Sequence, residues 1–126
     1  MQDIIANALN CIMNAKRAGK EFCVVPSSNF LIKLLDIMKK HDYIRRYEEE
    51  QTKNSRMVKI EFGKLNECKA IKPRFYVTKK EFDKYIRRFL PARDFGIIIV
   101  STSLGLITHK EAIEKGIGGS LIAYCF

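Results

Sequence analysis

The feature that most constrains the fold of this chain is a change in hydrophobic period within its first half. Apolar residues recur every three to four positions from Ile4 to Met13 and again from Phe30 to Met38, which is typical of two amphipathic helices. The segment "EFCVVP" between them is short, rich in strand-forming residues and closed by Pro26. We therefore expect a helix, a strand and a second helix, in this order.

Two extended segments follow the second helix. "YIRRYEEE" and "MVKIEF" are joined by the polar turn "QTKNSR", and apolar residues of the latter alternate with charged ones. Ser27 or Ser28 can cap the preceding helix by accepting a backbone N–H. These elements predict an N-terminal α/β domain, of order αβαββ, over residues 1–63.

Residues 64–126 show a different pattern. The extended, proline-interrupted segment "CKAIKPRFYV" is followed by "KKEFDKYIRRFL", whose apolar residues share one helical face, and then by the apolar run "FGIIIV". A last apolar segment, "SLIAYCF", follows the glycine-rich turn "GIGG". The expected second unit is a mainly β C-terminal domain with short helices, so the expected fold class is α+β.

The charge of the chain is strongly basic and unevenly spread. It has 23 Lys and Arg against 14 Asp and Glu, a formal net charge of +9. Residues 64–93 hold 10 basic and 3 acidic side chains, whereas residues 1–63 hold 11 and 8. Such an excess points to a polyanionic partner, and the second half of the chain carries most of the positive field. The alternative is that the lysines only keep a small protein soluble.

The polar face of the first helix is unusual in composition. It carries Asn7, Asn10 and Asn14 beside Arg17, although asparagine is a mediocre helix former and a good hydrogen-bonding group. A solvated face accounts for this pattern as well as an RNA-facing edge does, and both interpretations stay open.

The cysteines and the N-terminus bear on the compartment. Cys11, Cys23, Cys68 and Cys125 form no C-x-x-C pair and stand among apolar residues, which favours small buried hydrophobes in a reducing compartment over a zinc site or disulfides. The N-terminal segment lacks the pattern of a signal peptide, in which basic residues precede a long apolar stretch. No apolar stretch of the sequence is long enough to span a bilayer. We expect a cytoplasmic protein with no membrane partner, no metal and no cofactor.

The apolar run "GIIIV" stops abruptly on three hydroxyl residues. Ser101, Thr102 and Ser103 are followed by Gly105, and "THKE" carries the Thr-x-x-Glu pattern of a capping box that begins a helix at about Thr108. We expect a loop from Ser101 to Gly105 between a central strand and a short helix, where side chains are held rigidly yet presented to a ligand.

Two enzyme classes are disfavoured by the same segment. Ser103 and Gly105 match half of the hydrolase pattern G-x-S-x-G, but Ser101 stands in place of its first glycine. Of the two histidines, His41 and His109, the second lies in the capping turn beside a lysine, where we expect it to face solvent. No G-x-x-x-x-G-K-[ST] phosphate loop is present. We expect no enzymatic activity and no small-molecule substrate.

Contact with RNA fits the chemistry of this loop. The shallow minor groove of A-form RNA displays 2′-hydroxyls and base edges, which small donor and acceptor groups can read at close approach. Hydroxyls both donate and accept, and Gly105 lacks a Cβ that would block that approach. The alternative is that the hydroxyls only satisfy local backbone groups. Candidate phosphate ligands around the loop are Lys72, Arg74, Lys79, Lys80, Arg87, Arg88 and Lys110.

A family resemblance favours the RNA interpretation. "LPARDFGIIIVSTSLGLITHKEAIEKGIGGSLIAYCF" resembles the C-terminal half of the universal small-subunit ribosomal protein eight family, called S-fifteen-A in eukaryotic cytosolic ribosomes. Its pattern is Ser-Thr-Ser-x-Gly, a hydrophobic pair, a small hydroxyl, Glu-Ala, a Gly-Gly pair and an aromatic C-terminus. "NALNCIMNAKRAGK", "VVPSSNFLIKLLDIMKKHDYI" and "IKPRFYV" extend the similarity over the chain, and "KPRF" and "LPARDFG" are similar to the archaeal and eukaryotic branch.

The resemblance implies both a fold and a set of contacts. Members have an α/β N-terminal and a mainly β C-terminal domain, and bind a stem in the central domain of small-subunit ribosomal RNA. It implies that the hydroxyl loop lies against the RNA minor groove. Two positions depart from the usual pattern: Leu104 stands where a polar residue is usual, and Ser120 stands where a longer polar residue is common. The RNA-binding residues implied beside the loop are Thr108 and, in the N-terminal domain, Asn14, Lys16, Ser27, Ser28 and Lys33.

The function expected from the sequence is thus structural. We expect a constituent of the small ribosomal subunit that binds its RNA, lies beside other small-subunit proteins in the cytoplasm, and supports subunit assembly and translation. The alternative is an RNA-binding regulator that works outside the ribosome with the same surface.

Overall fold

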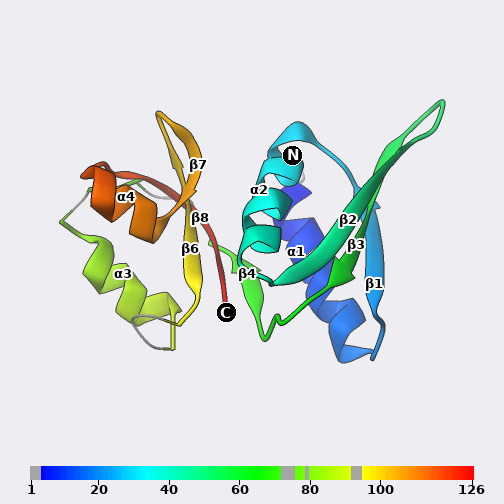
Figure 1. Cartoon of the computed structure of the whole chain (residues 1–126), viewed down its shortest axis with the longest axis horizontal. Coiled ribbons are helices and arrows are strands. Elements are labelled where there is room, and N and C mark those ends of the chain that lie inside the picture. Colours follow the sequence, from blue (N-terminus) through cyan, green and yellow to red (C-terminus); the bar gives the residue numbers. More distant parts are fainter. Residues whose placement is uncertain (1–3, 72–75, 79, 92–94) are drawn as a thin grey trace. The chain divides into compact units, whose positions relative to one another are not determined.

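A computed structural model describes residues 4–71, 76–78, 80–91 and 95–126 of the chain. The chain forms two compact units, Met1–Cys68 and Lys69–Phe126, and each is described by itself. The mixed arrangement of helices and antiparallel sheets confirms the α+β class (Figure 1).

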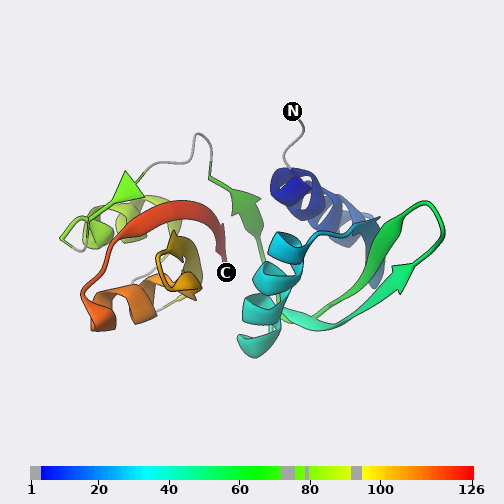
Figure 2. The same ribbon diagram turned by 90° about the horizontal axis from the view of Figure 1, so that it is seen from above.

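The first unit has the element order that the hydrophobic periods predict. Its strands form one antiparallel sheet of order β1-β3-β2, and both helices lie on the same side of that sheet (Figures 1 and 2). Ser28, not Ser27, caps the second helix, since its side chain accepts a hydrogen bond from Leu31 N–H at 3.1 Å. The elements are α1 (Ile4–Arg17), β1 (Phe22–Pro26), α2 (Asn29–Lys40), β2 (Ile44–Gln51) and β3 (Arg56–Phe62).

The core of the first unit lies between the helices and one face of the sheet. Alternate residues of β1 are buried, as expected of a strand with one covered and one open face. The apolar stripes of both helices supply the rest of the core. Its fully or almost fully buried members include Leu9, Ile12, Cys23, Val25, Leu31, Leu34, Leu35, Met38, Val58 and Ile60.

Two ion pairs join the strands of the β2–β3 hairpin. The Arg56 guanidinium donates to both carboxylate oxygens of Glu49, at 2.7 and 2.9 Å. The hydroxyl of Ser27 donates to the same carboxylate at 2.9 Å. Nearer the other end of the two strands, Arg46 binds its directly paired residue Glu61 through two donors. Part of the acidic run that follows Tyr47 therefore serves to hold this hairpin together.

The second unit is a five-stranded sheet with two short helices. The sheet order is β4-β8-β6-β7, and β5 also pairs with β8. α3 and α4 lie on one side of β6 and β8 (Figure 1). The elements are β4 (Cys68–Ala70), β5 (Tyr76–Val77), α3 (Phe82–Phe89), β6 (Ile97–Thr102), β7 (Gly105–Thr108), α4 (His109–Lys115) and β8 (Gly119–Cys125).

The core of the second unit joins the helices to the sheet. Phe82 and Ile86 of α3 and Ala112 of α4 pack in one cluster with inward-facing strand residues such as Val100 and Leu121. Aromatic rings of α3 and β8 stack along its margin, with the centroids of Phe89 and Tyr124 5.4 Å apart. This packing fixes the position of β6, the strand that leads into the hydroxyl residues.

Two expectations for this unit are wrong. The segment from Ser101 to Gly105 is not a loop between a strand and a helix, because an additional strand, β7, pairs with β6 before α4 begins. His109 does not face solvent: it is 1% exposed, and its Nδ1 accepts a hydrogen bond from Ile98 N–H at 3.1 Å. Both errors have one cause, namely that β7 folds back on β6 and carries the start of α4 over the sheet.

Candidate RNA-binding surface

The hydroxyl residues form the end of a β-hairpin. Thr102 and Gly105 are paired, so Ser103 and Leu104 make the turn between β6 and β7. Gly105 has φ +103°, in the region that favours glycine, and a Cβ added there would meet no atom within 4 Å. The glycine therefore shapes the turn and also leaves the space above it open.

Thr102 braces this turn from within. Its hydroxyl accepts a hydrogen bond from Leu104 N–H at 3.0 Å and donates one to the Gly105 carbonyl at 2.9 Å. A side chain that both accepts and donates within four residues leaves the turn little freedom. For Thr102 the local interpretation of the hydroxyl is correct, and its contribution to ligand binding is to hold its neighbours in place.

Ser101 and Ser103 differ from Thr102 in this respect. Within the part of the chain that the structure describes, neither serine hydroxyl makes a hydrogen bond. Ser103 is exposed at the turn, and Ser101 is half-buried at the end of β6. The hairpin thus presents two hydroxyls whose donor and acceptor capacity is available to a ligand.

A row of side chains across the sheet continues the surface from Ser101. Ser101 is paired with Leu106 of β7 on one side and with Ser120 of β8 on the other, and Ser120 is paired with Tyr76 of β5. Directly paired residues of antiparallel strands project from the same face. Tyr76, Ser120, Ser101 and Leu106 are called the cross-strand row below. The sequence analysis did not include Tyr76, Ser120 or Leu106 among the site residues.

The strands of this surface approach each other closely at Gly119. A Cβ at this position would lie 2.5 Å from the Ser101 carbonyl oxygen and 2.7 Å from Val100 Cγ1. Such contacts are far inside van der Waals distance, so β8 can lie against β6 here only with glycine. The Gly-Gly pair before β8 thereby sets the position of Ser120 beside Ser101.

Thr108 is buried and begins α4. It is 2% exposed, and its hydroxyl accepts a hydrogen bond from Glu111 N–H at 3.3 Å, which confirms the helix start predicted from the capping pattern. His109 follows it into the core. Because Nδ1 of His109 is occupied by Ile98 N–H, this ring is not available as a general base for Ser103.

The cations expected near the hydroxyls lie at different ends of the unit. Lys80 is exposed and follows Thr78 by two residues. Thr78 lies close to Gly118, since a Cβ on Gly118 would be 3.0 Å from the Cα of Thr78. Lys80 is therefore near the end of β8 that carries Ser120. Arg88 is exposed near the C-terminus of α3, where Leu90 approaches Gly96 at the start of β6. Gly96 precedes β6 and the hairpin turn follows it, so Arg88 lies toward the opposite end of this strand from the turn.

Other cations complete this distribution. Lys110 is exposed in the first turn of α4, and Arg87 is exposed on α3. Lys72, Arg74 and Lys79 lie outside the described residues. Near Lys80, Glu81 accepts hydrogen bonds from the hydroxyl and N–H of Thr78, at 2.8 and 3.4 Å. These bonds lower the pKa of the Glu81 carboxyl, so it stays charged at neutral pH and holds the segment that leads into α3.

The candidate residues of the first unit lie in three places: at the end of α1, on α2, and between β1 and α2. Asn14 and Lys16 are on the last turns of α1, with Asn14 exposed and Lys16 half-buried, and Lys33 is exposed on α2. Ser27 and Ser28 are half-buried between β1 and α2, and both hydroxyls are used within the unit, by Glu49 and by Leu31 N–H.

The described residues contain no group of three or more His, Cys, Asp or Glu side chains placed to hold a metal ion. All four cysteines are free thiols: three are buried, and Cys11 is half-buried, which differs from the expectation that all four are buried. In the described ranges no helix has the length and apolar character needed to cross a membrane.

Comparison with known proteins identifies the family. The family model described as ribosomal protein S8 matches residues 3–126. This chain belongs to the ribosomal protein S8 family. It is similar to the small ribosomal subunit protein uS8 of the archaeon Nanoarchaeum equitans, with 45% identity over 127 residues, covering 99% of this chain and 98% of the relative. The family resemblance seen in the sequence is thus confirmed.

Proposed function

We propose that this chain is a structural, non-catalytic component of the small ribosomal subunit and that its second unit binds a stem of the central domain of the subunit's RNA. Membership of the ribosomal protein S8 family supports the first part. The observation that supports the second part is that the hydroxyls of Ser101 and Ser103 have no hydrogen-bond partner among the described residues, on a hairpin whose turn is braced by Thr102. The protein belongs in the cytoplasm, among neighbouring small-subunit proteins.

Selectivity comes from the hairpin and the cross-strand row. Ser101 and Ser103 exchange hydrogen bonds with 2′-hydroxyls and base edges in the minor groove, the only groove of A-form RNA wide enough for such contacts. Because the turn is already ordered, little conformational entropy is lost on binding. Tyr76, which is 68% exposed at the end of the row, extends the contact surface across the sheet.

Leu104 adds an apolar contact at the tip of the hairpin. Its side chain is 62% exposed, and it stands beside Ser103 in the turn. An aliphatic side chain at this place packs against the apolar edge of a ribose, which removes water from the neighbouring hydroxyl contacts and strengthens them. Leu104 thereby takes the place of the polar residue expected from the resemblance.

Affinity comes from phosphate contacts. Lys80 and Lys110 are exposed and make no ion pair within the described residues. Cations near the hairpin neutralise phosphates of the RNA stem whose minor groove the hairpin enters. These contacts carry no sequence information. The second unit as a whole has 11 basic and 5 acidic side chains, which favours this role.

Sedimentation of cell extract tests the assignment to the subunit. The chain should sediment with small subunits in buffer of high salt, because an integral component is held by many contacts in addition to charge. A soluble pool without any subunit-bound fraction would contradict the proposal and favour the regulator that works outside the ribosome.

Stem binding tests the proposed site. The unmodified protein should bind a central-domain stem about 10³-fold or more tightly than an unrelated duplex of equal length. The double substitution Ser101→Ala/Ser103→Ala should remove most of that ratio while leaving the salt dependence unchanged. Ser55→Ala is the matched control, because Ser55 is an exposed serine of the β2–β3 turn whose loss should leave both affinities as they are. Equal loss of both affinities in the double variant would contradict the proposal.

A further inference from the structure

The first unit contains a hollow between α1 and the edge strand β1 that the proposed hairpin contact does not use. β1 is the outer strand of its sheet, with β3 on one side only. The hollow has a volume of about 860 Å³, within the usual range for a small-ligand site. Asn7, Asn10 and Asn14 of α1 line it, and these are the asparagines that make the polar face of this helix unusual.

The rest of the lining of this hollow is mostly small and apolar, and Lys20 and Glu21 are its charged members. It includes Cys11 and Ala15 of α1 and Cys23 and Val24 of β1. Burial, with the neighbouring Cys11 thiol, raises the pKa of Cys23 to about 12, so this thiol is neutral at physiological pH. A flat apolar surface with amide groups at its rim suits a nucleic-acid base, since an amide can both donate to and accept from a base edge.

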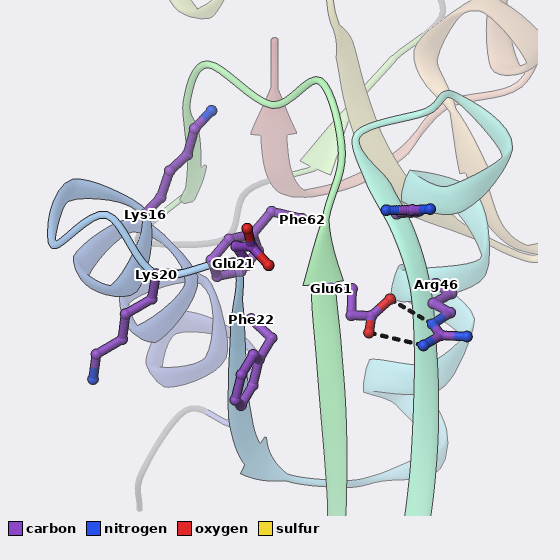
Figure 3. Close-up of a pocket in the computed structure, with 8 residues that line it drawn as sticks. Lys16, Lys20, Glu21, Phe22, Arg46, Glu61 and Phe62 are labelled. Carbon is purple, nitrogen blue, oxygen red and sulfur yellow. Dashed lines mark hydrogen bonds and ion pairs between the residues drawn. The ribbon is translucent and has the colours of Figure 1, made fainter.

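A basic pocket adjoins this hollow. It has a volume of about 530 Å³ and shares Lys20, Glu21 and Phe22 with the first hollow. Lys16 extends from the last turn of α1 and Lys20 from the segment after this helix, in different directions, while Arg46 is bound to Glu61 across the sheet (Figure 3). The other arginine of the pocket is Arg45.

The cations of this pocket are not equally available. Arg46 is occupied by Glu61, and the bond between Arg46 Nη2 and Glu61 Oε1 is 3.0 Å long. Lys16, Lys20 and Arg45 form no ion pair with a carboxylate among the residues described. Glu21 is the one other acidic residue of the lining, so the lining holds three cations without a carboxylate partner and one such carboxylate. The balance favours an anionic group such as a phosphate.

Phe22 stands where the two hollows meet. Its side chain is 46% exposed, which is unusual for phenylalanine, and the ammonium group of Lys59 lies 4.4 Å from the centroid of its ring. This cation–π contact restricts the ring, and the exposed part remains accessible. An oriented, exposed aromatic ring beside available cations is the arrangement by which proteins bind unpaired nucleotides.

We infer that the hollow between α1 and β1 binds one unpaired RNA nucleotide, with the base against Phe22 and the asparagines and its phosphate in the pocket of Lys16, Lys20 and Arg45. The inference rests on the proposed function only in that RNA is the partner. It gives the first unit a contact of a different kind from the hairpin: a single unpaired nucleotide rather than the groove of a stem.

Binding of a short single strand to the full chain tests this inference. The probe is fluorescein-labelled hexaadenylate, followed by fluorescence anisotropy. Phe22→Leu keeps an apolar side chain but removes the ring, so it should weaken binding roughly 5- to 100-fold, the usual range for loss of one base–aromatic stack. Phe22→Tyr should retain binding. The matched control is Phe95→Leu, a residue of the second unit that is 48% exposed and should have no effect.

Protection of a thiol locates the bound strand. Cys11 lines the hollow and is the one partly exposed cysteine, since the other three are buried. Hexaadenylate should slow the alkylation of Cys11 by N-ethylmaleimide. The protection should persist in Ser101→Ala/Ser103→Ala, so a failure of the hairpin proposal leaves this result intact, and a failure here leaves the hairpin proposal intact.

Two results would overturn the inference. One is an equal effect of Phe22→Leu and Phe95→Leu without protection of Cys11, which means that the strand is held by charge alone. The other is protection of Cys11 by an extended synthetic peptide and not by hexaadenylate, which means that the free edge of β1 takes a protein strand. Asn10→Ala adds a check that does not depend on Phe22: it should weaken hexaadenylate binding and leave binding of inorganic tripolyphosphate unchanged.

Discussion

The β2–β3 hairpin of the first unit and the surface of the second unit use their charged residues in opposite ways. On the β2–β3 hairpin of the first unit, Arg46 and Arg56 are bound to carboxylates of the same hairpin. On the second unit, exposed cations such as Lys80 and Lys110 have no carboxylate partner within the described residues. Paired charges stabilise a hairpin locally and cancel its field, whereas unpaired ones leave a field for a polyanion. Net charge alone does not distinguish these two uses.

The hydroxyl groups of the second unit show the same distinction on a smaller scale. Thr102 is fully occupied by its own turn, while Ser101 and Ser103, its neighbours in sequence, are available. A hydroxyl that is bonded within its own turn stabilises that turn, whereas a hydroxyl without such bonds can bind a ligand. The predictions below test whether this distinction accounts for stability and binding in each unit.

The largest expected effect is on the stability of the second unit. His109→Ala removes a buried ring and the acceptor for Ile98 N–H, so it should lower the free energy of unfolding by about 2–4 kcal/mol. Amide hydrogen exchange should accelerate at Ile98 and along β6, with little change in β1–β3. Unchanged exchange at Ile98 would mean that this hydrogen bond does not join α4 to the sheet.

The next effect separates two cations of the second unit by their distance from the hairpin. Lys80→Ala should weaken binding to the cognate stem and to an unrelated duplex alike, and should reduce the slope of log K against log salt by about 1. Arg88→Ala should change the slope less, because Arg88 lies toward the opposite end of β6 and its guanidinium is 5.4 Å from the Phe89 ring. Equal slopes for both variants would show that the hairpin is not the centre of the contact.

The smallest effect concerns the paired charges of the first unit in acid. Hydrogen bonds from Arg56 and Arg46 lower the pKa values of the Glu49 and Glu61 carboxyls. A carboxyl whose pKa is lowered by folding contributes stability above its unfolded pKa, and this contribution is lost as the pH falls through the folded pKa. Below about pH 4.5 the protection of the β2–β3 amides, measured relative to their intrinsic exchange rate at the same pH, should therefore fall. In Glu49→Gln/Glu61→Gln this acid-dependent loss of protection should be smaller; an unaltered pH profile would show that the pairs contribute nothing.

The elements that the sequence predicts correctly are those set by local patterns. The stripes of α1 and α2 follow from helical spacing, and the start of α4 follows from Thr108 and Glu111 alone. The alternation of "MVKIEF" likewise predicts β3. In each of these cases the determining residues lie within a few positions of each other.

The features that the sequence analysis missed depend on residues far apart in the chain. β7 is only four residues long, and its existence depends on the turn at Gly105 and on pairing with β6. The burial of His109 depends on Ile98, eleven residues away. The cross-strand row joins Tyr76 to Ser120, a pairing set by register that no local pattern records. The residues predicted from the segment Ser101 to Gly105 therefore include the hairpin turn but not the rest of the cross-strand row.

The most direct test of the hairpin is a thermodynamic cycle between a serine and the RNA. Ser103→Ala and removal of a single 2′-hydroxyl from the minor groove of the stem are measured separately and together, at each position of the stem in turn. If Ser103 binds a 2′-hydroxyl, one position should show a coupling of about 1 kcal/mol, the usual net value of one hydrogen bond. Effects that add at every position would contradict the account, because the serine would then not contact the groove.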